Sequence, residues 1–139
     1  MNDYRADLIT YRLERADALL QTCRNLVDDR DWFSLANRLY YAVYQAISAL
    51  LVHNAIPVNS HTGAKAMFDL HFVKTNKAEV KWSKLYTRLS DARHSSDYGA
   101  FIEFTPDDVL PLLPQTEAFI DLIKGMISSD SAPTNVPEP

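Results

Sequence analysis

The side chains best suited to chemistry stand together in one short polar stretch. Arg93, His94, Asp97 and Tyr98 fall within six residues and are followed by Gly99, a usual residue where a helix ends. Arg93 and Asp97 are four residues apart, so on a helix they share one face. An arginine fork matches two phosphate oxygens, and a histidine titrates near neutral pH and can move a proton. The same residues could instead close a helix with an Arg93–Asp97 ion pair, and both interpretations stay open.

The other reactive side chains form no catalytic or metal-binding pattern. His53, His61 and His71 are scattered, and no cluster of histidines and carboxylates has metal-ligand spacing. The sequence holds no glycine-rich phosphate loop and no serine in a hydrolase-type turn. Cys23, the single cysteine, occupies an apolar position typical of a core residue. We therefore expect neither a metal ion nor a cofactor.

The composition indicates a single helical domain. The chain has 139 residues, of which 47% are hydrophobic, 23% are charged and only three are glycine. The net charge of −4 argues against a protein that coats nucleic acid, although it leaves room for a local basic site. The chain has no signal-peptide pattern, and no apolar run approaches the roughly 18 residues of a membrane span. With a single cysteine, these features predict a cytoplasmic protein.

Apolar periodicity predicts the helices that must position these residues. The expected helices cover residues 4–29, 32–54, 62–74, 77–96 and 105–127. The second is apolar almost all round and should be the central helix, with Asp31 as its N-cap. Thr105 and Asp108 form a capping-box pattern before the last helix, which Pro111 and Pro114 should kink.

These segments predict an all-α fold, an up-and-down four-helix bundle with one short extra helix. The bundle is expected to occupy residues 1–127. Residues 128–139 are polar and rich in proline, which predicts a disordered tail.

Two polar edges are predicted on the fourth helix. At 100° per residue, Lys77, Lys81, Lys84 and Arg88 form one narrow stripe, and Arg93 borders the apolar face on its other side. The stripe is either a solvated helix face or a track for an RNA backbone. Because Arg88 belongs to this stripe, Arg93 is the stronger candidate for chemistry.

Four short motifs also occur in order along the chain: Asn37-Arg38-Leu39-Tyr40-Tyr41-Ala42, Ser60-His61-Thr62-Gly63, Phe72-Val73-Lys74, and Arg93 followed by Asp97-Tyr98-Gly99. In this order and at these helix positions, the sequence resembles the HEPN (higher eukaryotes and prokaryotes nucleotide-binding) domain family. It is most similar to the small stand-alone prokaryotic subgroup. The resemblance implies a HEPN-like helical bundle that forms a homodimer.

The resemblance also implies a biological setting and an activity. Many such proteins are toxins paired with a minimal nucleotidyltransferase antitoxin, and active members are metal-independent ribonucleases. Their motif is an arginine followed after four to six residues by a histidine, and two copies meet across the dimer. If Arg93 is that arginine, the histidine position holds Tyr98. Arg88 and His94 satisfy the spacing, but on one helix they point about a third of a turn apart.

The resemblance therefore implies a toxin component that cleaves or binds RNA as a dimer. The alternative is a non-catalytic module that binds a nucleotide or interacts with the nucleotidyltransferase. The candidate catalytic residues are Arg93, His94 and Tyr98, and related modules suggest that Tyr98 accepts AMP from the partner enzyme. The candidate residues for binding RNA or a nucleotide are Asp97, Asn37, Arg38, Lys84 and Arg88.

Overall fold

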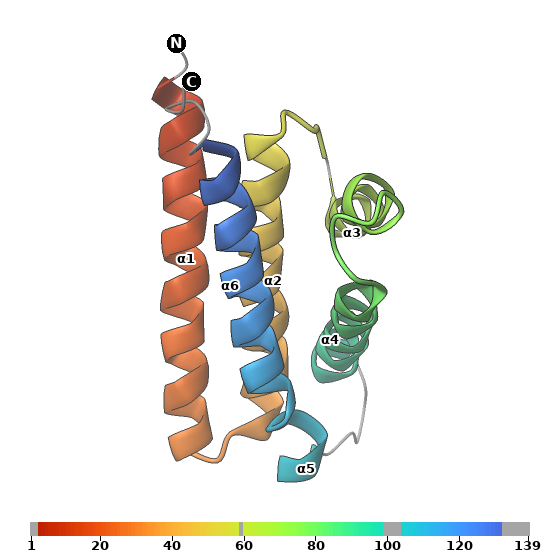
Figure 1. Cartoon of the computed structure of the whole chain (residues 1–139). Helices are drawn as coiled ribbons and strands as arrows, with labels where there is room; N and C mark the ends of the chain where they lie inside the picture. Colours follow the sequence, from red (N-terminus) through yellow and green to blue (C-terminus); the bar gives the residue numbers. More distant parts are fainter. Residues whose placement is uncertain (1–2, 59, 99–103, 132–139) are drawn as a thin grey trace.

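The structure is a bundle of helices, as its sequence predicts (Figure 1). The computed structural model describes residues 3–58, 60–98 and 104–131. Its elements are α1 (Asp3–Asp28), α2 (Trp32–His53), α3 (His61–Phe68), the π-helical turn η1 (Asp69–Val73), α4 (Val80–Tyr98), α5 (Pro106–Val109) and α6 (Leu112–Ser131). These ranges contain no strand, and the all-α fold is confirmed.

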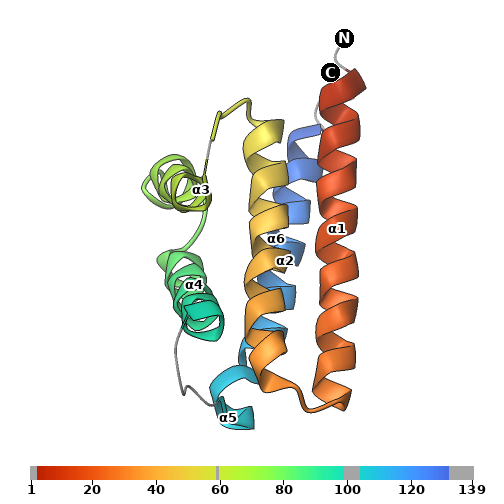
Figure 2. The same cartoon turned by 180° about the vertical axis from the view of Figure 1, so that it is seen from behind.

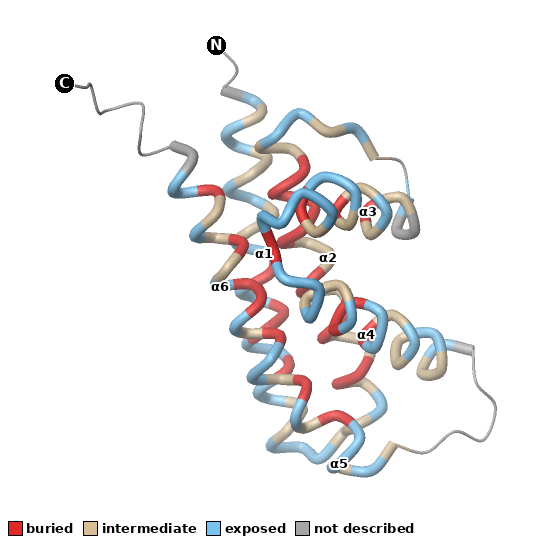
Figure 3. Tube along the Cα trace, turned by 45° about the vertical axis from the view of Figure 1, so that its right-hand side comes forward, coloured by how far each residue is buried: buried red, intermediate tan, exposed pale blue. Residues whose placement is uncertain are grey.

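α2 lies at the centre of the bundle. The long helices α1, α2 and α6 run side by side, and α3 and α4 lie on the other side of α2 from α1 (Figures 1 and 2). α2 contacts every other α-helix, which explains why its sequence is apolar almost all round. Buried residues gather where α2, α4 and α6 meet (Figure 3).

An aromatic cluster joins α6 to α3 and α4. The Phe119 side chain of α6 is fully buried. Its ring meets the edge of Phe68 in α3, with 5.4 Å between ring centroids, and stacks on Trp82 of α4 at 5.0 Å. This cluster holds α4, which carries Arg93, against the rest of the core.

The predicted helix caps are present. The Asp31 carboxylate accepts a hydrogen bond from the backbone N–H of Ser34 at 3.1 Å, which caps α2. The Asp108 carboxylate accepts one from the backbone N–H of Thr105 at 2.8 Å, which closes the first turn of α5. Ser60 caps α3 by accepting a hydrogen bond from the backbone N–H of Gly63 at 3.0 Å.

The prediction that the fourth helix begins at Lys77 was wrong, because α4 begins at Val80. Asn76 adopts a positive φ of 63°, which turns the chain. The backbone N–H groups of Lys77 and Ala78 then donate to the Phe72 carbonyl at 2.8 and 2.9 Å, and Ala78 is buried. Lys77 therefore lies before the helix and outside the predicted lysine stripe.

Three other features of the elements differ from the prediction. The chain after α3 continues into the π-helical turn η1, whose bonds span one residue more than those of an α-helix. The last predicted helix is divided at Pro111 into α5 and α6, because proline lacks the N–H group that a continuous helix needs. α6 extends to Ser131, four residues beyond the predicted bundle boundary at residue 127, and the rest of the predicted tail lies outside the described residues.

Cys23 is a core residue, as its position in the sequence predicts. Its side chain is buried, and burial raises the pKa of the thiol to about 12. The thiol is therefore neutral at physiological pH and is a poor nucleophile. In the part of the chain that the structure describes, no helix is both long and apolar enough to cross a membrane.

Candidate functional site

Arg93 projects from the face of α4 that meets α2. Tyr86, Ser90, Arg93 and Asp97 follow one another at spacings of four, three and four residues, so they line up along this face. The Arg93 guanidinium carbon lies 4.9 Å from the ring centre of Tyr40 in α2. This distance is within the range of a cation–π interaction. Three turns of α4 thus present one cation, one carboxylate and two hydroxyl groups toward α2.

Tyr41 lies between two arginines. The Arg93 guanidinium carbon is 5.9 Å from the Tyr41 ring centre, and that of Arg38 is 5.1 Å from it. The Nη1 group of Arg93 also donates to the Tyr41 hydroxyl oxygen at 3.5 Å. The aromatic pair therefore restrains the Arg93 side chain without neutralising its charge.

A chain of polar contacts connects Arg93 to α2. Nη1 of Arg93 donates to Oδ2 of Asp97 at 3.3 Å, and the side-chain amide of Asn37 donates to the other carboxylate oxygen at 2.7 Å. Arg38 then donates to the Asn37 side-chain oxygen, with its Nε group at 2.8 Å. The predicted residues Arg93, Asp97, Asn37 and Arg38 thus form one network, although Asn37 and Asp97 are 60 positions apart.

The electrostatics of the network favour a permanent positive charge on Arg93. Burial by itself would lower the pKa of Arg93, but the oxygens of Tyr41, Tyr40 and Asp97 outweigh it and raise this pKa above its ordinary value. The Arg93 side chain is 20% exposed, so part of the guanidinium remains open to solvent. Among the described residues, its buried Nε group has no hydrogen-bond partner. The Asp97 ion pair therefore uses only part of the donor capacity of Arg93.

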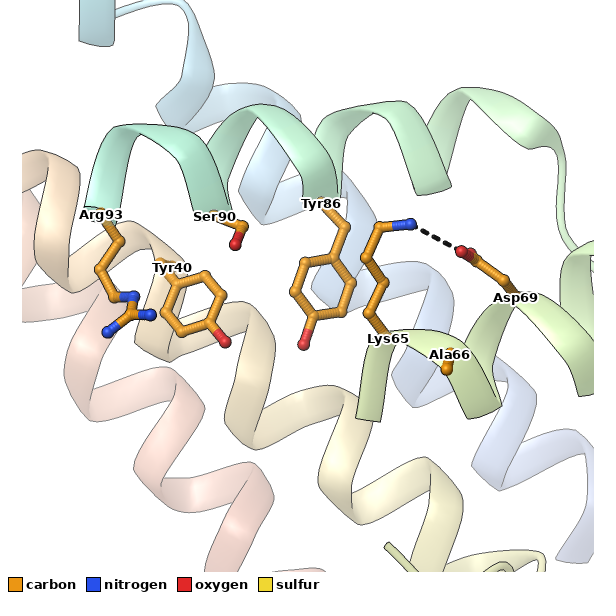
Figure 4. A pocket seen from close by; sticks show the side chains of 7 residues that line it. All are labelled: Tyr40, Lys65, Ala66, Asp69, Tyr86, Ser90 and Arg93. Carbon is orange, nitrogen blue, oxygen red and sulfur yellow. Dashed lines mark hydrogen bonds and ion pairs between the residues drawn. The ribbon is translucent and has the colours of Figure 1, made fainter. Parts of the chain in front are cut away.

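A cavity of about 340 Å³ begins at Arg93 and runs along α4 (Figure 4). Arg93 lies at one end, and the Lys65–Asp69 ion pair, with 2.6 Å between Nζ and Oδ2, lies at the other. The cavity is lined by Tyr40, Lys65, Ala66, Asp69, Tyr86, Ser90 and Arg93. Its volume is at the small end of the range for ligand sites, roughly 300–1,000 Å³.

Other predicted residues lie outside this cavity. His94 follows Arg93 on α4, is exposed and does not line the cavity. The side chain of Tyr98 lies outside the described part of the structure. Lys84 and Arg88 are exposed, and Nη2 of Arg88 donates to the side-chain oxygen of Gln115 in α6 at 3.3 Å. The structure therefore separates Arg88 from the Arg93 network.

The other residues that line the cavity, and Tyr41 beside it, were not among the site residues predicted from the sequence. Tyr40 and Tyr41 follow Asn37 and Arg38 by three residues, so they share a helix face with this polar pair. That spacing could have indicated that the two tyrosines belong to the same site. Lys65 and Asp69 are also four residues apart, which is typical of a helical ion pair. No local pattern, however, places them opposite Tyr86.

Metal binding finds no support in the described part of the chain. No group of three or more histidine, cysteine, aspartate or glutamate side chains is arranged there to hold an ion. The residues that line the cavity instead include two phenols and two cations, one of which is paired with the Asp69 carboxylate. Such a lining suits a ligand that carries both an anionic group and a planar ring.

Comparison with known proteins identifies relatives over most of the chain. The model of the HEPN domain matches residues 9–126. A UPF0332 protein of Thermotoga maritima is 33% identical over 127 residues, which cover 91% of this chain and 96% of the relative. A protein of Methanocaldococcus jannaschii named "Putative toxin" is 27% identical over 117 residues, covering 84% of this chain and 80% of the relative. Because the family model spans nearly the whole bundle, this chain belongs to the HEPN domain family.

Proposed function

We propose that this chain is a toxin-type HEPN protein that binds RNA as a homodimer, with Arg93 in contact with the phosphate backbone. Two relatives from Methanocaldococcus jannaschii carry the name "Putative toxin", which supports the toxin assignment. The resemblance to stand-alone prokaryotic HEPN proteins supports RNA as the ligand and a minimal nucleotidyltransferase as the antitoxin partner.

The observation that carries the proposal is the state of Arg93. The Arg93 side chain is held between α2 and α4 by Tyr40, Tyr41 and Asp97, yet it borders a cavity and remains 20% exposed. A restrained, partly desolvated arginine loses little conformational freedom when it binds an anion. A phosphate oxygen is the ligand that the guanidinium fork matches best.

Binding is better supported than cleavage by the geometry of one protomer. In HEPN-type cleavage the RNA 2′-hydroxyl attacks the adjacent phosphorus, and the bond from that phosphorus to the 5′-oxygen of the next nucleotide breaks. An arginine stabilises the added negative charge, and a second group moves a proton from the 2′-hydroxyl to the leaving 5′-oxygen. Here Arg93 could stabilise that charge, and His94 or Tyr98 would have to move the proton. His94 is exposed and does not line the cavity. RNA binding requires only Arg93, whereas cleavage also requires His94 or Tyr98 to approach the phosphate that Arg93 holds.

The same observation favours a second candidate function. Because His94 is exposed and does not line the cavity, the chain could act as a non-catalytic module that binds a nucleotide and interacts with a nucleotidyltransferase. The two functions differ in ligand size, because an RNA strand extends beyond the cavity whereas a mononucleotide does not. An affinity for RNA no greater than that for a mononucleotide would favour the second function.

RNA binding is the direct test of the proposal. Fluorescence anisotropy with a labelled single-stranded RNA is expected to give a Kd of about 10⁻⁴ M or tighter at physiological salt, weakening as salt rises because phosphate contacts release counterions. Expression in bacteria, with and without a co-expressed nucleotidyltransferase, tests the toxin assignment by growth arrest and its relief. Absence of both RNA binding and growth arrest would contradict the proposal.

The homodimer is a separate prediction. An isologous contact through the face that carries Arg93 would bring two copies of the polar network together, since a two-fold axis pairs each surface with itself. Light scattering after gel filtration at micromolar concentration is expected to give twice the chain mass of 15.8 kDa. A monomer mass throughout the concentration range would contradict this prediction.

A further inference from the structure

The cavity beside Arg93 has a second polar end that phosphate binding does not use. Lys65 of α3 and Asp69, the first residue of η1, form an ion pair there (Figure 4). Lys65 Nζ also lies 3.3 Å from the Ser83 hydroxyl oxygen of α4, which fixes this end of the cavity near Ser83. The Arg93 end and the Asp69 end are therefore separated along the axis of α4.

The separation suits one nucleotide. Tyr86 and Arg93 both line the cavity and are seven residues apart, which corresponds to roughly 10 Å along a helix. A mononucleotide has a similar length from its 5′-phosphate to the far edge of its base. A phosphate at Arg93 would therefore place the base beside Tyr86, with its far edge directed toward the Lys65–Asp69 pair, which lies near Ser83, almost one helical turn further along α4.

Tyrosines form the walls between the two ends. The rings of Tyr40 and Tyr86 have their centres 5.9 Å apart, and both residues are almost fully buried. Burial raises the pKa of both phenols above the ordinary value, so both stay neutral at physiological pH. Neutral aromatic walls accept a planar base without the desolvation cost of a charged wall.

The two oxygens of the Asp69 carboxylate differ in their hydrogen bonding. Its Oδ2 atom pairs with Lys65, whereas its Oδ1 atom is buried and has no hydrogen-bond partner among the described residues. A buried acceptor without a partner destabilises the fold, and a ligand that donates a hydrogen bond to it removes that penalty. Asp69 lines the cavity, and rotation about its last side-chain bond exchanges the oxygen that pairs with Lys65 and the oxygen that has no partner. An ionised carboxylate can only accept hydrogen bonds, and it therefore selects a ligand that donates one.

From this arrangement we infer that Asp69 reads the base of the nucleotide whose phosphate Arg93 holds, by accepting a hydrogen bond from an exocyclic amino group. The inference rests on the proposed function, and it adds the residue that determines base specificity. Cytosine carries an amino group at ring position 4, where uracil carries a carbonyl oxygen. Carboxylates accept from the cytosine amino group when proteins read nucleic acid bases, whereas the uracil carbonyl would face the carboxylate without a donor. The site therefore prefers cytosine to uracil.

Calorimetric titration of the full-length protein with CMP and UMP tests this inference. Wild type is expected to bind CMP about tenfold or more tightly than UMP, because one hydrogen bond to a charged group contributes about 1.5–3 kcal/mol. In Asp69→Asn the preference should fall to about twofold or less, since an amide can present either a donor or an acceptor. Asp17→Asn is the matched control, because Asp17 also pairs with a lysine, Lys124, at 2.7 Å, but lies away from the cavity.

The possible results separate this inference from the proposed function. Circular dichroism shows whether Asp69→Asn folds. If it does not fold, the inference is tested by the ratio of CMP to UMP affinity in wild type and in Lys65→Gln. A ratio near one in wild type overturns the inference. Equal binding of CMP and UMP, both lost in Arg93→Ala, would overturn base reading by Asp69 and leave phosphate binding in place. RNA binding without measurable binding of either mononucleotide would likewise overturn the inference alone. Loss of RNA binding as well would remove the proposed function.

Discussion

Arg93→Ala is expected to weaken RNA binding by about 10- to 100-fold, whereas Arg88→Ala changes it by about twofold or less. One hydrogen bond from a charged donor contributes about 1.5–3 kcal/mol, and tenfold in affinity corresponds to about 1.4 kcal/mol. Arg93 is restrained by two tyrosines and borders the cavity, so its contact with a phosphate is formed at low entropic cost. Arg88 is exposed, and its contribution is that of a screened surface charge.

The measurement is fluorescence anisotropy with one labelled RNA for wild type, Arg93→Ala, Arg93→Lys and Arg88→Ala, with folding checked by circular dichroism. Arg93→Lys should recover part of the affinity, because lysine keeps the charge but lacks the planar fork. If wild type also cleaves the RNA, Arg93→Ala should lower the rate by about 10²–10³-fold, the usual effect of losing one donor to a charged transition state. A larger loss in Arg88→Ala than in Arg93→Ala would instead support Arg88 and His94 as the functional pair.

Phe119→Ala is expected to lower the free energy of unfolding by about 3–5 kcal/mol, the usual cost of truncating a fully buried phenylalanine. The Phe119 ring contacts Phe68 in α3 and Trp82 in α4, so its loss opens a cavity where three elements meet. The melting temperature should fall by about 10 °C or more, because 1 kcal/mol corresponds to roughly 2–8 °C in domains of this size range.

Thermal and urea unfolding followed by circular dichroism measure this effect. Phe33→Ala is the matched control: Phe33 is 42% exposed, and its ring is tilted against that of Phe104, at 5.8 Å between ring centroids. That variant should lose about 1 kcal/mol or less, since a half-exposed ring buries less apolar area. Similar losses in the two variants would show that Phe119 does not hold α3 and α4 to the core.

The sequence carried the information for the helices and for their order. Helix formation depends on contacts between residues three or four apart, and these spacings can be read directly from the chain. The same local rules predicted the Asp31 cap and the Thr105–Asp108 pair, because a capping side chain bonds to a backbone group only three residues away. They also predicted that Arg93 and Asp97 share a face, and the two side chains form an ion pair.

Residue spacing failed to predict helix boundaries where a backbone N–H group has two possible hydrogen-bond partners, one in the helix and one in a turn. Lys77 continues the spacing of the lysine stripe, but its N–H group bonds to the Phe72 carbonyl, and the burial of Ala78 favours that turn over a longer helix. Similarly, helical periodicity does not reveal that the chain changes to π-helical bonding at Asp69. These boundaries depend on how the segment packs against the rest of the core, and the sequence of a single segment does not specify that packing.

The sequence by itself determined that Arg93 and Asp97 share one helix face and that Asn37, Arg38, Tyr40 and Tyr41 are close together on another. Only the tertiary structure decided that these two faces meet, with the Asn37 amide on the Asp97 carboxylate and the Tyr40 ring under Arg93. It also decided that Lys65 and Asp69 close the far end of the cavity, while Arg88 lies outside it. The physical reason is that spacing along a helix sets which residues share a face, whereas the packing of side chains across α2, α3 and α4 sets the rotation and height at which those faces meet.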